Sequence, residues 1–143
     1  MALKILDHGS KEYHQMVELR TQILRKPLGL TFSPQELENE KNDLLIGAFE
    51  DEEMLGCCML VKENPQIIRL RQMAVQNNLQ GKGIGASLMH FAEDLCRDLG
   101  ARKIIMHARA TAVGFYEKLG YKVVSDVFEE VSIPHYIMEK DIV

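Results

Sequence analysis

The feature that most constrains this chain is a glycine-rich turn between a strand-like segment and a helical one. The turn reads Gln80-Gly81-Lys82-Gly83-Ile84-Gly85-Ala86, follows an apolar run over 66–75 and precedes a helical pattern over 83–99. Glycine lets the backbone turn sharply and lets a ligand approach it, and the first amides of a helix have no partners within the helix. The turn therefore predicts an anion site suited to phosphate. By spacing alone, a plain turn with Gly85 packed on the sheet is an equal alternative.

Two other kinds of glycine loop do not fit this turn. A dinucleotide-binding fingerprint needs a third glycine at a fixed spacing and an acidic residue after the next strand, but the predicted strand 103–108 is followed by Arg109. A Walker A loop needs Gly-Lys-Ser or Gly-Lys-Thr, which Gly81-Lys82-Gly83 does not supply.

The pattern of apolar residues and turn signals predicts alternating strands and helices along the whole chain. The expected strands cover 3–6, 44–50, 54–61, 66–75, 103–108, 121–131 and 135–142. The expected helices begin after Ser10, at the capping box of Ser33 and Glu36, at 83 and at 111, and Gly100 is placed to end the third. Consecutive strands imply antiparallel pairing, and the strand-helix-strand unit over 66–108 implies one parallel pair. We therefore predict an α+β fold with a mixed, mostly antiparallel sheet flanked by helices, formed by residues 1–143 as a single domain.

Composition narrows the classes of function. The formal net charge of -4 argues against a nucleic-acid partner bound by a broad basic face, and no apolar run approaches membrane-spanning length. There are three cysteines, two of them adjacent at Cys57-Cys58, which is a poor disulfide framework and favours a reducing, cytoplasmic setting. No Cys-x-x-Cys or His-x-x-x-His spacing occurs, so we predict no metal site.

Two ordered motifs give the chain a resemblance to a known family. Gln80-x-x-Gly83-x-Gly85 is similar to the Arg/Gln-x-x-Gly-x-Gly/Ala signature of the GCN5-related N-acetyltransferases (GNAT), and Ala112–Tyr121 resembles that family's A-x-x-F-Y-x-K-x-G-F/Y segment. Upstream, Leu70–Val75 looks like the family's fourth strand. Phe128 and the tail segment 133–138 also resemble the ElaA-like subgroup, although Ser132 replaces its glycine. The resemblance implies a splayed central parallel strand pair and an N-acetyltransferase that uses acetyl-CoA as co-substrate.

The resemblance also implies which residues bind the cofactor. The loop would hold the pyrophosphate of acetyl-CoA, and the backbone of the fourth strand would pair with its pantetheine arm. Arg109 stands where many members have asparagine, so it could meet a cofactor phosphate or simply be exposed. The cofactor-binding residues expected on this basis are Met73, Ala74, Val75, Gln80, Gly81, Lys82, Gly83, Ile84, Gly85, Ala86, Arg109 and Tyr116.

Catalytic residues follow from the chemistry of the transfer. The family places a tyrosine at Tyr116, and a phenol is protonated at neutral pH and can donate to the departing thiolate of coenzyme A. An amine must lose a proton to attack, so a base or a base-held water is needed. We expect that base from Glu129 or His135, with Glu130 and His107 as further candidates, although each alone is more often structural.

The acceptor is predicted only as a class. Arg69 and Arg71 alternate on one strand face, where they could bind an acidic substrate group or form a solvated face. In the family the segment here numbered 25–33 shapes the acceptor site, and its mixture of apolar and basic residues permits a small-molecule or peptide amine. A homodimer through strand edges is plausible. Two alternatives stay open, a catalytically weak acyl-CoA-binding sensor and a nucleotide-binding domain.

Overall fold

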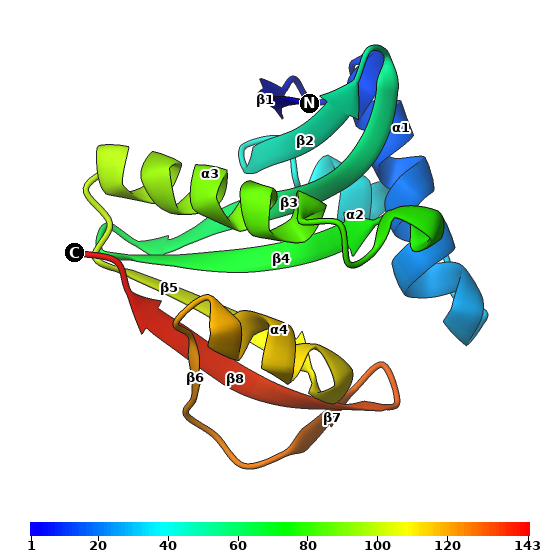
Figure 1. Cartoon of the computed structure of the whole chain (residues 1–143). Coiled ribbons are helices and arrows are strands. Elements are labelled where there is room, and N and C mark those ends of the chain that lie inside the picture. Colours follow the sequence, from blue (N-terminus) through cyan, green and yellow to red (C-terminus); the bar gives the residue numbers. More distant parts are fainter.

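One eight-stranded sheet organises the computed structural model, which describes all residues from 1 to 143 (Figure 1). Its order is β1-β2-β3-β4-β5-β8-β6, with β7 also paired to β8. Only β4 and β5 run parallel, so the predicted α+β class with a mostly antiparallel sheet is confirmed. The strands are β1 (Ala2–Leu6), β2 (Leu44–Glu50), β3 (Glu53–Asn64), β4 (Ile67–Val75), β5 (Lys103–Arg109), β6 (Lys122–Val123), β7 (Phe128–Glu130) and β8 (Ile133–Asp141).

Helices cover both faces of the sheet (Figure 1). The helices α3 (Ile84–Asp98) and α4 (Val113–Lys118) lie on one face, and α1 (Lys11–Arg20) and α2 (Pro34–Glu38) lie on the other. We call these the α3/α4 face and the α1/α2 face. None of the helices is both long and apolar enough to cross a membrane.

Helix ends follow the capping signals of the sequence. The Ser10 side chain accepts a hydrogen bond from the Tyr13 amide at the start of α1, and Ser33 and Glu36 form the predicted capping box. Beyond α1 the chain continues through a π-helical turn over Thr21–Arg25 and a short 3-10 turn over Lys26–Leu28, and then reaches Gly29 at φ 71°. The segment predicted to shape the acceptor site is therefore an irregular extension of α1.

Each face has its own apolar core. Nineteen buried residues form the core under α3 and α4, with Leu88, Met89 and Ala92 of α3 fully enclosed. Ten buried residues form the core under α1, which contributes Tyr13, Met16 and Leu19. Alternation along the strands assigns each side chain to one face, because successive residues of a strand point to opposite sides.

The predicted strand over 121–131 is wrong in its middle. Only β6 and β7 are strands there, and both pair with β8 around an irregular stretch at Ser125–Val127. The Ser125 hydroxyl accepts a hydrogen bond from the Ile137 amide at 2.8 Å, so a side chain satisfies a β8 amide in place of a strand neighbour. The β7–β8 hairpin then turns through Val131 and Ser132, both at positive φ (46° and 64°), which suits a two-residue turn.

Candidate active site

The central feature of the site is the divergence of β4 and β5. Their parallel pairing begins at Ile67–Lys103 and stops at Leu70–Met106, although both strands continue. Beyond that point β4 stays with β3, through the pairs Cys57–Ala74 and Gly56–Val75. The register between β3 and β4 shifts there, and Gln72 lies at φ 58°, which marks a β-bulge. Backbone groups of β4 that would face β5 are therefore left without a strand partner, in the segment predicted to bind pantetheine.

The glycine loop leads from this open edge to the start of α3. Gly81 and Gly83 lie at φ 81° and 86°, which L side chains rarely adopt, and a Cβ at either would meet nothing within 4 Å. Gly83 is the N-cap of α3, no side chain caps it, and the helix is 15 residues long. Because a helix leaves its first amides without internal partners, Ile84, Gly85 and Ala86 present N–H groups at the positive end of the helix dipole. An anion fits this geometry.

Two other loop residues contact the protein itself. The Gln80 amide donates to the Val75 carbonyl at 3.2 Å, so it ties the loop back to the end of β4. A Cβ at Gly85 would lie 3.0 Å from Cζ of Phe115, so Gly85 lets the Phe115 ring of α4 pack against the start of α3. The alternative of Gly85 against the sheet is thus replaced by a helix–helix contact. Lys82 is exposed.

Tyr116 is enclosed on the α3/α4 face. It is 6% exposed and packs edge-on against Phe115 and Tyr121, with ring centroids 4.9 and 5.9 Å away. Its hydroxyl makes no hydrogen bond within the chain. Burial, with a smaller effect of Cys58, raises the pKa of Tyr116 well above the ordinary tyrosine value. The hydroxyl therefore stays protonated at neutral pH.

A polar cluster lies on the other face, where four strands contribute one residue each. His107 Nδ1 is 2.9 Å from Glu130 Oε1 and 3.0 Å from Arg69 Nη2. His135 is 4% exposed, donates from Nδ1 to the Ile133 carbonyl at 2.8 Å, and turns Nε2 towards Glu130 Oε2 at 3.7 Å. We call Arg69, His107, Glu130 and His135 the His107 cluster. Sequence reasoning named its members without grouping them.

Two other predicted site residues do not belong to this cluster, although Arg109 stands opposite His135 in the register of β5 and β8. Glu129 is exposed and pairs with Pro134, so the alternation of β7 points its side chain to the face opposite Glu130. Arg109 lies on the α1/α2 face and donates from Nη2 to the Leu24 carbonyl at 3.0 Å, which ties the extension of α1 to the end of β5. A cofactor contact for Arg109 stays a prediction.

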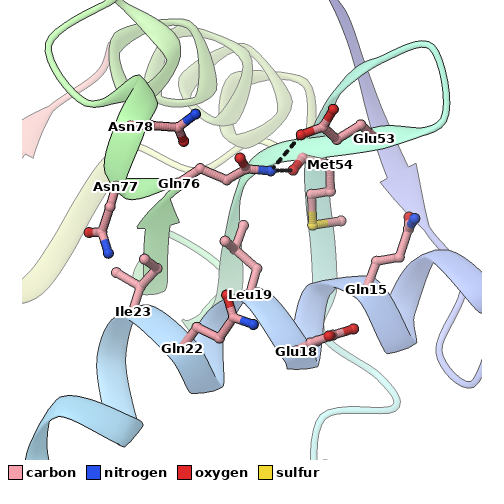
Figure 2. Close-up of a pocket in the computed structure, with 10 residues that line it drawn as sticks. All are labelled: Gln15, Glu18, Leu19, Gln22, Ile23, Glu53, Met54, Gln76, Asn77 and Asn78. Carbon is pink, nitrogen blue, oxygen red and sulfur yellow. Dashed lines mark hydrogen bonds between the residues drawn. The ribbon is translucent and has the colours of Figure 1, made fainter.

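One cavity lies away from the diverging strands. It measures about 440 Å³ and lies between α1 and the ends of β3 and β4, as Figure 2 shows. None of its lining residues comes from β5, α4 or the glycine loop, and Glu18 and Glu53 give it a negative charge that disfavours phosphate. The lining residues are Gln15, Glu18, Leu19, Gln22, Ile23, Glu53, Met54, Gln76, Asn77 and Asn78. The candidate site is therefore defined by the separation of β4 and β5 and not by this cavity.

One parallel pair, β4 and β5, separates within an otherwise antiparallel sheet, and the glycine loop and α3 connect its two strands. Residues 19–142 match the acetyltransferase (GNAT) domain family, and the chain belongs to that family. The predicted membership in this family of N-acetyltransferases is confirmed.

Relatives and solved structures agree with this assignment. YjcF of Bacillus subtilis, an N-acetyltransferase by name, is 32% identical over 107 residues, which cover 74% of each chain. YyaT of the same organism is 31% identical over 74 residues, which cover 52% of this chain and 50% of YyaT. Escherichia coli ElaA superposes with a TM-score of 0.84 at 20% identity over 99% of this chain and all of its own. An aminoglycoside 6'-N-acetyltransferase complexed with coenzyme A gives 0.81 at 18% identity over 100% of this chain and 98% of its own.

Proposed function

We propose that this protein transfers an acetyl group directly from acetyl-CoA to a primary amine of a small molecule or peptide. The observation that carries the proposal is the open edge of β4 and β5 beside the uncapped start of α3. The first-turn amides of α3 would hold the pyrophosphate, Lys82 would add a positive charge, and the backbone of Met73, Ala74 and Val75 would hold the pantetheine arm. When bound, acetyl-CoA supplies an activated thioester.

Tyr116 is the proposed proton donor. Its hydroxyl has no partner in the chain, and the raised pKa keeps a proton on Oη at neutral pH. That proton can pass to the sulfur of the departing coenzyme A. Glu129 and His135 are the bases expected from the sequence. Glu129 is exposed and points to the face opposite Glu130, whereas His135 is buried beside Glu130.

Binding is tested with Gly83→Glu, which puts a carboxylate into the cradle. Isothermal titration with coenzyme A should show binding to the natural protein and none to the variant. Gly9→Glu is a matched control, because Gly9 has a similar φ of 81° against 86° for Gly83 and equally open surroundings. Normal affinity in folded Gly83→Glu, or tighter binding of ATP or NAD than of coenzyme A, would remove the loop from this role.

Turnover is tested by thiol release over a panel of glycine, putrescine, kanamycin and tri-alanine. Tyr116→Phe should bind coenzyme A normally and lower kcat by about 10²–10⁴-fold, the usual contribution of a general acid. Phe115→Leu is the control for altered packing beside it. Tight binding without turnover of any amine would favour the acyl-CoA sensor instead, and an unchanged rate would exclude Tyr116 from the chemistry.

The three cysteines are free and buried, which supports a reducing compartment such as the cytoplasm. A homodimer stays a prediction that gel filtration with light scattering can decide.

A further inference from the structure

The His107 cluster lies beside the point where β4 and β5 separate. Met106 is the last β5 residue paired with β4, so His107 is the first residue beyond the pairing. Ile104, Met106 and Ala108 belong to the core under α3 and α4, so alternation directs His107 to the α1/α2 face. His107 thus lies where β4 and β5 separate, which is where the thioester is proposed to bind, and on the sheet face opposite Tyr116.

We propose that His107, oriented by Glu130, is the proton acceptor for the attacking amine. This inference rests on the proposed function and names a residue pair that the family match does not assign. Arg69, through its charge, and His135, through Nε2 at 3.7 Å from Glu130 Oε2, are positioning residues for Glu130.

The contact with Glu130 selects one tautomer of His107. An ionised carboxylate can only accept hydrogen bonds, so the 2.9 Å contact with Glu130 requires a proton on Nδ1, whereas the 3.0 Å contact with the Arg69 guanidinium requires the lone pair there. The two bonds exclude each other in the neutral ring, and in the proposed arrangement the bond to Glu130 forms, with the proton on Nδ1. Nε2 then carries the lone pair that can take a proton. Arg69 Nη2, 3.0 Å from Nδ1, cannot donate to a protonated nitrogen. Its charge instead favours the ionised form of Glu130.

The surroundings of Glu130 keep it ionised. Partial burial would raise the pKa of Glu130, but the hydrogen bond to His107 and the nearby His107, His135 and Arg69 outweigh burial and lower it. His135 is fixed by the Ile133 carbonyl and is almost fully buried, so it sets the place of the β7–β8 hairpin. Phe128 packs edge-on against His107 at 5.2 Å and stacks on His135 at 6.0 Å, which fixes both rings.

The transfer balances with these groups. The lone pair of a neutral amine forms the bond to the acetyl carbon, and the carbon–sulfur bond breaks with its electron pair going to sulfur. The amine proton passes to Nε2 of His107, and the sulfur takes the proton from Oη of Tyr116. Solvent then carries the proton from His107 to Tyr116, so both side chains regain their starting states.

The first test reads the tautomer directly in the cofactor-free protein. Long-range ¹H–¹⁵N correlation spectra of ¹⁵N-histidine-labelled protein should show neutral His107 protonated on Nδ1. Glu130→Gln should reduce that preference, whereas Glu63→Gln, at an exposed end of β3, should not. A ring protonated on Nε2 in the natural protein would overturn the proposal.

The second test reads the pH profile of kcat/KM with an amine from the panel. His107→Gln should lower kcat by about 10²–10⁴-fold, leave coenzyme A affinity unchanged and remove the acid limb of the profile. Imidazole should restore part of the rate of His107→Ala. The matched control is His90→Gln, at an exposed position on α3.

The outcomes distinguish failure of the proposed function from failure of the His107 assignment. A natural protein that turns over no amine overturns both. If amines are acetylated and His107→Gln keeps a normal rate and acid limb, only the assignment of His107 fails. If Glu129→Gln loses turnover and Glu130→Gln does not, then Glu129 is the proton acceptor and the assignment of His107 and Glu130 is overturned.

Discussion

The two faces of the sheet carry different kinds of functional group (Figure 1). The α3/α4 face encloses nineteen buried residues under two helices, and its functional groups are backbone amides and one phenol. The α1/α2 face has a ten-residue core, and three of the four buried polar or charged residues, Arg20, Glu40 and His135, lie on this side. Binding a cofactor of fixed shape needs a rigid backbone, whereas moving a proton from an amine needs a titratable side chain. Predictions on each face can therefore test whether the division is real.

The largest expected effect is on the α1/α2 face, at Arg20. Its side chain is fully buried and makes two hydrogen bonds to Glu40, at 2.8 and 2.6 Å, while Tyr13 donates to the same carboxylate at 2.8 Å. Arg20→Ala leaves a buried carboxylate without its cation, which should lower the free energy of unfolding by about 3–5 kcal/mol. Urea denaturation at pH 7 measures this.

The control for Arg20 is an ion pair in solvent. Lys41 lies 3.4 Å from Glu38 with both side chains 58% exposed, so Lys41→Ala should change the free energy of unfolding by only about 0–1 kcal/mol. Equal effects of the two substitutions would show that the buried pair is not what stabilises the α1/α2 face.

On the α3/α4 face the corresponding test is apolar. Leu88 of α3 is fully buried in the nineteen-residue core, so Leu88→Ala should cost about 2–5 kcal/mol in urea denaturation through lost transfer energy and the cavity left behind. Coenzyme A affinity should weaken as well, because α3 carries the anion site. Val127→Ala, at a 56% exposed position, should stay within about 0.5 kcal/mol of the natural protein. If Leu88→Ala is destabilised but binds coenzyme A with normal affinity, then the anion site does not depend on the packing of α3 in this core.

The same division explains what could be predicted from the sequence. The elements of the α3/α4 face are encoded locally, because the glycine loop, α3 and its end at Gly100 are contiguous in the chain. The predicted helix over 83–99 accordingly matches α3 closely. Fold class and family also followed, since both depend on motif order.

The α1/α2 face depends on pairings between distant residues. Arg69 and His107 are 38 residues apart, and His107 and Glu130 are 23 apart, so only strand register brings them together. Register also separates Glu129 from Glu130, because a shift of one residue moves a side chain to the other face of the sheet. The irregular stretch at Ser125–Val127 breaks the predicted strand, and it depends on a bond to Ile137 that no local pattern announces. Residue type and predicted strand position identified the candidate bases on this face, but they could not show which of them lie together.

The smallest expected effect concerns the charge of Glu130. Burial raises the pKa of Glu130, but the hydrogen bond to His107 and the nearby charges outweigh burial, so the pKa is lowered in the folded protein. The ionised form of Glu130 therefore stabilises the fold. This contribution is fully present above the ordinary glutamate pKa of about 4.3 and is lost as pH falls through the lower folded value. The side chain is 42% exposed, so solvent screens the interaction and the effect must be smaller than those at Arg20 and Leu88.

Urea midpoints of the natural protein and Glu130→Gln, compared between pH 7 and pH 3, isolate this contribution. The natural protein should lose more stability than Glu130→Gln over that interval, because only the natural side chain has a proton to take up. His107→Gln should reduce the same difference, since it removes the largest stabilising partner of the carboxylate. If Glu130→Gln instead follows the natural protein across the whole interval, the carboxylate is not held by the His107 cluster in solution. Among its charged groups, the α1/α2 face would then keep the buried Arg20–Glu40 pair as the one shown to be held in the fold.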